Sequence, residues 1–427
     1  EDAMIRFLFK GLIRDRNRSL IPLIVTATGV MLTVVFHAWM TGVIGNSIEF
    51  NARFAAGHVK IMTGAYSENA GQSPNDLAIL GTDTLTGIIS SEIPEMDFAE
   101  RIYFGGLIDV PDSAGETRAQ GPAFGIGIDM LSGRNDEAER MNITSSLRSG
   151  RLPMNRNEAI LSSDFADKLE INPGDRFTLV GSSMYGELTM HNFILCGTVE
   201  FGITALDKGT IIADIQDVRE ALNMYDATGE ILGFFRTGTY DDEQATLIVN
   251  RFNEKYFSAD DEFSLLMKSL AQQNNMGFLV EYSGKLKAIL VAVFIMAMSL
   301  ILWNAGLLGG LRRYGEFGMR LAIGEEKGHV YRTMLMESLI IGLFGSLAGV
   351  AAGMVIALYL QDHGIDLGIM MKNASIMMPH LFRARITPET WYIGFVPGFL
   401  STQLGALLAG IGIYRRQTAQ LFKELEA

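Results

Sequence analysis

The chain has 427 residues, of which 48% are hydrophobic, and a formal net charge of −13 at pH 7. A uniformly water-soluble protein does not readily combine this hydrophobic fraction with this net charge. The distribution of the charged residues along the chain therefore decides which class of protein it is. Four long segments contain no Asp, Glu, Lys or Arg: 19–48, 288–311, 338–361 and 390–414. A helix needs about 20 apolar residues to cross a hydrocarbon core about 30 Å thick, so each segment is long enough to span a bilayer. This pattern excludes an ordinary soluble enzyme.

The segment before the first span, 1–18, is basic and places several apolar side chains on one helical face: Phe7, Leu8, Leu12 and Ile13. This predicts an amphipathic helix in the headgroup layer, with an unstructured basic anchor as the alternative. The uncharged segment 19–48 is far longer than the roughly 7–15 residues of a signal-peptide core, which favours a transmembrane helix over a cleaved signal.

Residues 49–287 contain 36 Asp and Glu against 19 Lys and Arg, which predicts a water-soluble domain that repels nucleic acid. Alternating apolar residues predict strands at 58–62, 101–110, 123–129, 176–181 and 191–201. The part from about Asp242 to 287 is expected to form two helices, the second running through 265–275 and 281–287 as a stalk continuous with span two. Strands mixed with amphipathic helices predict an α+β domain.

Basic residues flank the spans in segment 1–18, in segment 312–337 and in tail 415–427, and such residues tend to stay cytoplasmic. Both termini are therefore expected in the cytoplasm, with domain 49–287 and the short loop 362–389 on the outer side. The predicted fold class is an α-helical membrane domain with four transmembrane helices in a 1+3 arrangement, plus a large extracytoplasmic α+β domain between the first two.

Signals for catalysis are missing from the sequence. No segment matches the phosphate-binding G-x-x-x-x-G-K-[ST] loop, H-E-x-x-H, a paired Cys motif or the G-x-S-x-G elbow. His37 is the one ionisable residue inside the predicted spans, whereas a proton-coupled carrier needs several. We therefore predict no catalytic residue, no metal site and no cofactor in this chain, and an energy source located in a partner.

The segment 311–338 has the most distinctive local pattern. It resembles the cytoplasmic coupling segment of the FtsX-like permeases, roughly E-x-G-x-x-R-A-x-G, with Phe317 where Ile is usual. The residues that carry this likeness, and that the resemblance implies couple the chain to an ATPase, are Glu316, Phe317, Gly318, Arg320, Leu321 and Gly324. An ordinary basic loop explains the flanking arginines but not the placement of Glu and Gly.

A second likeness lies in 149–181, where a G-R-x-P segment, an E-A-x-[IL] strand, a helix and a P-G-D turn follow one another. It is similar to the outer domain of the same family, and GHVKI at 57–61 and the tail YRRQTAQLFKELEA add to it. Together these segments identify the chain as a member of the MacB/Lol superfamily of ABC transporter permeases, closest to the LolC and LolE lipoprotein-release permeases.

The resemblance implies a multi-pass protein of the bacterial inner membrane that acts by mechanotransmission. Its implied partners are a cytoplasmic ATPase dimer, which binds ATP and Mg, a second permease subunit, identical or not, and a periplasmic lipoprotein substrate or carrier. The leading hypothesis is extraction of lipoproteins from the membrane. The alternatives are MacB-type efflux of drugs or peptides and FtsX-type regulation of a cell-wall hydrolase.

Extraction requires an apolar surface that receives acyl chains, because each buried methylene contributes about 0.8 kcal/mol. Candidate groove residues are Val35, Phe36, Trp39, Met40 and Val43 in span one and Met296, Leu300 and Trp303 in span two. Ordinary lipid-facing packing explains the same side chains without a groove.

Overall fold

The computed structural model describes residues 16–133, 136–201, 204–273, 276–311, 314–366 and 381–415. The chain divides into two compact units. The helical unit comprises Glu1–Asn46, Ser283–Ile365 and Leu381–Ala427, and the α/β unit comprises Ser47–Tyr282 and Asp366–His380. Most of the predicted amphipathic segment 1–18, much of loop 362–389 and nearly all of tail 415–427 lie outside the described residues.

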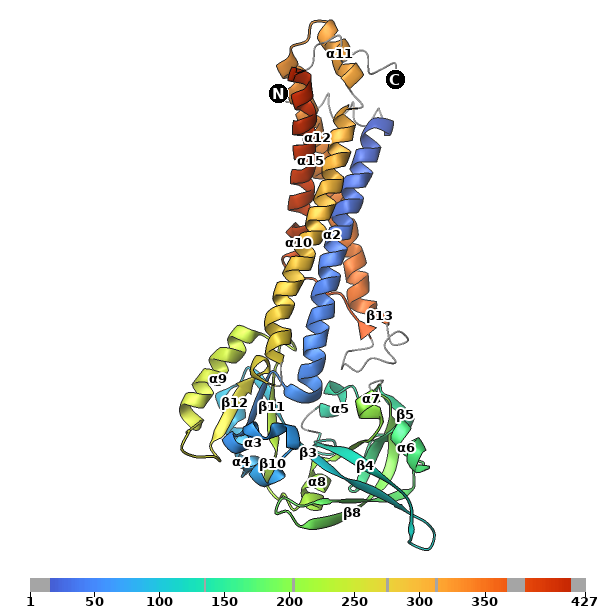
Figure 1. Cartoon of the computed structure of the whole chain (residues 1–427), viewed down its shortest axis with the longest axis vertical. Coiled ribbons are helices and arrows are strands. Elements are labelled where there is room, and N and C mark those ends of the chain that lie inside the picture. The colour runs from blue at the N-terminus through green and yellow to red at the C-terminus, as the bar shows by residue number, and fades with distance from the viewer. Residues whose placement is uncertain are drawn as a thin grey trace. The chain divides into compact units, whose positions relative to one another are not determined.

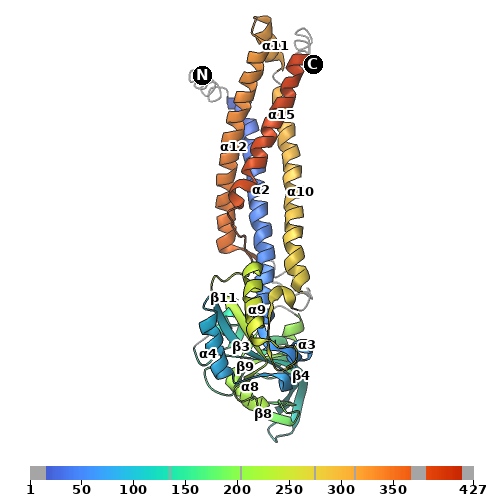
Figure 2. The ribbon, with the colours of Figure 1, turned by 90° about the vertical axis from the view of Figure 1, so that its left-hand side faces the viewer.

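The described part of the chain contains four helices long and apolar enough to cross a membrane: Leu20–Ala56, Met276–Leu308, Lys327–His363 and Thr390–Ile411. They correspond to α2 (Arg16–Asn51) with the π-helical turn η1 (Ala52–Ala56), α10 (Met276–Leu311), α12 (Lys327–His363), and α14 (Thr390–Ile393) with α15 (Phe395–Arg415). Within the helical unit these helices run side by side (Figures 1 and 2). The prediction of four apolar helices is confirmed, and their orientation in the membrane stays a prediction.

Glycines bring the backbones of these helices close together. A Cβ atom on Gly349 of α12 would lie 2.5 Å from the carbonyl oxygen of Ala27 in α2, and one on Gly353 would lie 2.8 Å from Val34 Cβ. Small residues at such spacing permit tight helix packing in a bilayer, where no hydrophobic force drives helices together.

The α/β unit is built on a ten-stranded sheet with the order β12-β1-β11-β3-β4-β9-β6-β8-β5, and β7 pairs with both β3 and β8. The strands are β1 (Val59–Thr63), β3 (Met96–Pro111), β4 (Thr117–Ile128), β5 (Leu147–Gly150), β6 (Glu158–Ser162), β7 (Arg176–Ser182), β8 (Leu188–Val199), β9 (Thr210–Asp214), β11 (Glu230–Phe235) and β12 (Leu265–Ser269). All five strands predicted from alternation are present. The pairings β3-β4-β9-β6-β8-β7-β3 close a six-stranded ring.

Short elements complete the chain. The further helices are α3 (Gly64–Glu68), α4 (Thr82–Glu92), α5 (Glu137–Arg140), α6 (Ser163–Leu169), α7 (Thr204–Asp207), α8 (Ile215–Leu222), α9 (Asp242–Tyr256) and α11 (Tyr314–Ala322), with 3-10 turns η2 (Ala70–Gln72), η3 (Asn75–Leu77) and η4 (Leu270–Gln272). The minor strands are β2 (Ile79–Leu80), β10 (Ala227–Thr228), β13 (Ile365–Asp366) and β14 (Leu381–Phe382).

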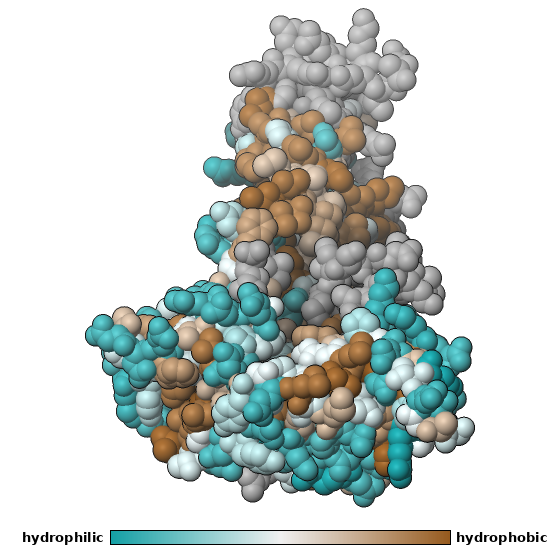
Figure 3. Space-filling view, turned by 60° about the horizontal axis from the view of Figure 1, so that its bottom comes forward, coloured by the Kyte–Doolittle hydropathy of each residue, from teal (hydrophilic) through white to brown (hydrophobic). Residues whose placement is uncertain are grey.

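Two lobes of the α/β unit share the long strand β3. One apolar cluster, with Ile108, Phe177 and Phe193, lies against the closed ring. Another, with Phe98, Ile231 and further residues of β1, β12, α4 and α9, forms the core of the second lobe. The face of the α/β unit that Figure 3 shows is mostly hydrophilic with a few hydrophobic patches, as expected for a domain that is folded in water.

One sequence prediction in this unit is wrong. The second helix was expected to run through 265–275, but Leu265–Ser269 is a strand that pairs antiparallel with β1, from Val59↔Ser269 to Thr63↔Leu265. The side-chain amide of Asn253 in α9 also donates a hydrogen bond from its Nδ2 to Met267 O and accepts one at its Oδ1 from the Met267 N–H. These long-range backbone hydrogen bonds outweigh local helix propensity, so a helix begins only at Met276.

Candidate functional site

The predicted coupling segment forms a helical hairpin in which α11 packs back on α12. Phe317 is completely buried and contacts Val330 and Met334, and Leu321 packs against the same cluster. Gly318 is also buried. The structure therefore assigns Phe317, Gly318 and Leu321 to packing of the hairpin, so that they hold its shape.

The end of α11 explains Gly324. Its φ angle is +101°, a conformation that favours glycine. The Gly324 amide donates to Leu321 O and the Glu325 amide to Arg320 O, which is the Schellman pattern at a helix C-terminus. The glycine thus ends α11 and turns the chain toward α12.

Arg320 is half-buried and makes a bidentate contact with Glu325, with Nε to Oε2 at 2.7 Å and Nη2 to Oε1 at 2.6 Å. Sequence analysis had grouped it with Glu316, which is also half-buried, as a coupling residue. Because Nε and Nη2 of its guanidinium both bind the Glu325 carboxylate, we infer that Arg320 stabilises the turn around Gly324.

Two apolar side chains of this hairpin face outward and were missed by sequence analysis. Met319 is 53% exposed and Ile323 is 82% exposed. They are four residues apart, so Met319 of α11 and Ile323, just after its last residue, lie on the side opposite Phe317 and Leu321. This spacing was the signal that could have found them, since an exposed apolar pair beside a charged turn suits a protein contact.

The predicted groove residues of span one lie on α2 within the helical unit. Val35, Phe36, Trp39, Met40 and Val43 are all half-buried. The Phe36 ring stacks on Phe294 of α10 with centroids 4.3 Å apart, whereas Trp39 packs with Ala38, Ala357 and Ala384. The five side chains therefore do not share one open surface.

The predicted groove residues of span two lie on one face of α10 and are exposed. Met296 is 66%, Leu300 50% and Trp303 39% exposed. Only 11% of the most apolar stretch of this helix is buried, compared with 33% to 44% in the other three candidate membrane helices. The three α10 residues therefore lie together on one exposed face, and the role of the α2 and α10 residues as a substrate groove stays a prediction.

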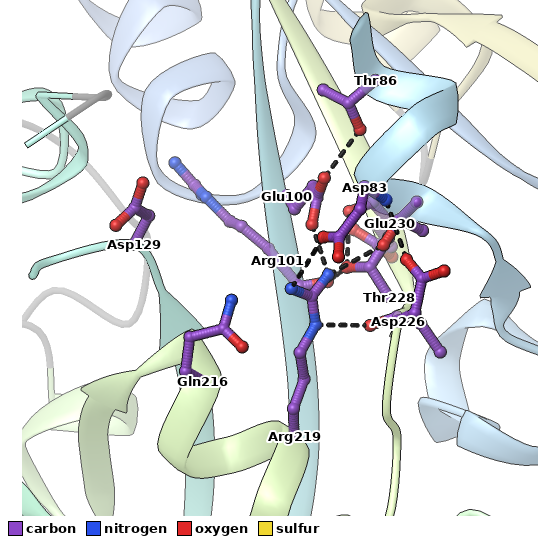
Figure 4. Close-up of polar contacts among 12 residues, drawn as sticks. Asp83, Thr86, Glu100, Arg101, Asp129, Gln216, Arg219, Asp226, Thr228 and Glu230 are labelled. Carbon is purple, nitrogen blue, oxygen red and sulfur yellow. Dashed lines mark hydrogen bonds and ion pairs between the residues drawn. The ribbon is translucent and has the colours of Figure 1, made fainter. Parts of the chain in front are cut away.

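A cleft of about 850 Å³ lies between the two lobes of the α/β unit. Its walls are α4 and the start of α8, and β3 contributes Phe98 and Glu100. Arg219 of α8 crosses the cleft: its Nη2 donates to Thr82 Oγ1 at 2.8 Å and pairs with Glu100, as Figure 4 shows for Glu100. This contact ties α8 to the first residue of α4, and sequence analysis did not predict it.

The described residues contain no group of three or more His, Cys, Asp or Glu side chains arranged to hold a metal ion.

Comparisons with known proteins locate the family signal in the C-terminal part. Residues 288–418 match the FtsX-like permease C-terminal family. Among solved structures, the periplasmic region of MacB from Actinobacillus actinomycetemcomitans is similar with a TM-score of 0.34 and 11% identity, over 51% of this chain and 91% of that one. No curated protein gives a significant match. Residues 288–418 are thus similar to an FtsX-like permease C-terminal domain.

Proposed function

We propose that this chain couples ATP hydrolysis by a cytoplasmic partner to a conformational change of its α/β unit. The family match over 288–418 carries this proposal, because that segment contains the hairpin of α11 and α12. In the proposed arrangement both termini and the hairpin are cytoplasmic, the α/β unit is periplasmic, and a second permease subunit completes the transporter in the inner membrane.

The hairpin provides a surface for an ATPase subunit. Met319 and Ile323 expose apolar area next to the Arg320–Glu325 ion pair, and Phe317 anchors α11 to α12. An apolar centre with a charged rim is typical of protein interfaces. A rigid hairpin transmits a push from a partner to α12, because α11 cannot move independently of its buried contacts.

This coupling is tested with the complex that copurifies with the full chain from its native membrane. Changing Ile323 to Ser should reduce copurification of the ATPase, while the chain itself still folds because Ile323 is exposed. Asp362→Ser, an exposed change at the opposite end of α12, is the matched control. Undiminished copurification of the ATPase with Ile323→Ser would place the contact elsewhere, and ATP hydrolysis by the highly purified chain alone would contradict the subunit assignment.

For the substrate, we propose lipoproteins extracted from the membrane. The exposed face of α10 at Met296, Leu300 and Trp303 supports this choice, since it offers contiguous apolar area and the polarizable, flexible side chain of Met. Acyl chains that leave the bilayer need such a surface. Phe36 and Phe294 mark where α2 and α10 meet, and we propose that this contact opens when the substrate enters.

A photo-crosslinker at Met296 or Trp303 should capture a lipoprotein in native membranes, and one at Phe36 should do so when the contact is open. Leu358 on α12 is 48% exposed and provides a control of similar exposure. Equal capture of a lipoprotein by a crosslinker at Leu358 would mean that the exposed face of α10 is not a specific binding surface. Capture of a small drug without any lipoprotein would favour MacB-type efflux.

A further inference from the structure

A fully buried arginine holds the C-terminal end of α2 inside the α/β unit. Arg101 lies on β3, and its guanidinium donates hydrogen bonds to the carbonyl oxygens of Phe54 at 2.6 Å and Arg53 at 2.7 Å. Both carbonyls belong to η1, the turn that continues α2. Carbonyl groups at a helix end lack partners within the helix and carry partial negative charge, so a cation is favoured there.

The charge of Arg101 is balanced within the protein. Its Nε donates to Glu137 Oε2 at 2.7 Å, and both side chains are 0% exposed. Glu137 also pairs with Arg140, whose guanidinium lies 4.3 Å from the centroid of the Phe234 ring. Burial favours a higher pKa for the Glu137 carboxyl, but the charges of Arg101 and Arg140 outweigh it and lower that pKa overall. The Glu137 carboxylate therefore lies between two guanidinium groups that favour its charged form.

The neighbouring residue of β3, Glu100, takes part in the contact that crosses the cleft. Glu100 pairs with Arg219 of α8 and accepts a hydrogen bond from Thr86 of α4 at 2.6 Å. Successive side chains of a strand point to opposite faces, and Figure 4 shows Arg101 directed away from the group around Arg219. Two successive residues of β3 thus contact the end of α2 on one face of the strand and Arg219, across the cleft, on the other.

We propose that Arg101 is the positioning residue of a joint within the α/β unit, where the last residues of α2 (Ser47–Asn51) and η1 meet β3, and that displacement of this end of α2 reaches β3 and the cleft through its guanidinium. The inference rests on the proposed function, which requires movement to enter the α/β unit. Apolar contacts alone are non-directional and let a helix end rotate. A planar guanidinium that is hydrogen-bonded to two carbonyls and a carboxylate prevents this rotation. Movement of the end of α2 therefore displaces β3 as well.

The joint is tested in the full chain in nanodiscs, with Cys196→Ala and spin labels at Asn51 on α2 and Lys168 on α6. Replacing both Arg101 by Met and Glu137 by Leu removes both members of the fully buried ion pair, and the remaining charge, Arg140, has a side chain that is 18% exposed. The matched control is Lys60→Met with Glu230→Leu, a buried pair at 2.6 Å between β1 and β11. Both double variants should melt cooperatively, but only the Arg101 variant should broaden the distance distribution between the labels. An unchanged distribution, or equal broadening in the control, overturns the inference.

A second variant keeps the test decisive if the double variant does not fold. Arg101→Lys retains the charge opposite Glu137 but lacks the fork that reaches both carbonyls, so the distribution should still broaden, and an unchanged one overturns the inference. In the copurified complex, ATP should shift the distance between the labels in the wild type and not in the Arg101 variants. A shift that persists in the variants contradicts the role of Arg101, whereas a wild type that ATP does not shift contradicts the proposed function.

Discussion

Gly349 of α12 lies so close to Val30 of α2 that a Cβ atom at position 349 would be 2.7 Å from the Val30 Cβ. A Cβ atom added to Gly394 would lie 3.0 Å from the carbonyl oxygen of the same valine, and one added to Gly398 would lie 2.3 Å from its Cγ2. Val30 is therefore enclosed by glycines of two other segments of the helical unit. This arrangement leaves no room for a larger side chain on any of the three.

Changing Gly349 to Leu should destabilise the helical unit by about 1–3 kcal/mol, the usual range for overpacking a tight contact. The measurement is thermal unfolding of the full chain in nanodiscs. Gly284 of α10 has no atom within 4 Å of an added Cβ, so Gly284→Leu is the control and should melt like the wild type. Equal melting of both variants would mean that α2 and α12 separate freely.

Changing Phe317 to Ala should release α11 from α12, because a completely buried Phe contributes about 3–5 kcal/mol of packing. The hairpin should then become sensitive to limited proteolysis between residues 314 and 327. Met319→Ala is the control, since its exposed side chain contributes within about 0.5 kcal/mol to stability. Resistance of the Phe317 variant would show that the turn alone holds α11 in place.

Gly324→Val should also loosen this hairpin, for a backbone reason. A side chain at φ = +101° is strained, and left-handed backbone costs an L-residue about 1–2 kcal/mol. Proteolysis between α11 and α12 again provides the measurement, with Ala322→Val in the last turn of α11 as the control. If both variants are cleaved equally, β-branching rather than the turn conformation is responsible.

Acid should destabilise the α/β unit partly through Glu158. The Arg151 guanidinium, the Asn155 side chain and the amides of Met154 and Asn155 hold the pKa of this carboxyl well below its usual range, although burial opposes the shift. A lowered pKa stabilises the folded state above the unfolded value of about 4.3, and this stabilisation is lost as pH falls below it. Glu158→Gln should therefore lower the melting temperature at pH 7, and the difference should shrink steadily below about pH 4.

The control for this titration is Glu95→Gln, at an exposed carboxyl of the same unit, which should melt like the wild type at every pH. A difference between Glu158→Gln and wild type that stays constant down to pH 2 would assign the loss to the shape of the side chain instead of its charge.

Cys196 should resist thiol reagents until the α/β unit unfolds. Burial raises the pKa of its thiol to about 12, and its Sγ donates a hydrogen bond to Ala159 O at 3.3 Å. The reactive species is the thiolate, which is scarce at pH 8 for such a group. Labelling with a chromogenic disulfide should be slow in the native protein and stoichiometric in denaturant, and rapid native labelling would indicate that β8 opens.

Much of the architecture is determined by local sequence. The apolar side chains of charge-free segments such as 338–361 are removed from water only in a bilayer or a protein core. The length of these segments predicts membrane-spanning helices, and the structure contains helices there. Alternation in segments such as 176–181 predicts strands because the period of two matches the pleat, and β7 lies there. Gly324 after an amphipathic segment signals the end of α11 in the same way.

Long-range partners decided the rest. Leu265–Ser269 looks helical in sequence, but β1 pairs with it and makes it a strand. Sequence analysis assigned Arg320 to coupling but did not predict its ion pair with Glu325, which the turn at Gly324 brings close to it. Arg101 is the first residue of the strand predicted at 101–110 and gives no local sign that it binds the end of α2. Its partners Arg53, Phe54 and Glu137 are brought to it only by the tertiary fold. Burial and pairing of charges depend on residues distant in sequence, and therefore only the folded structure reveals them.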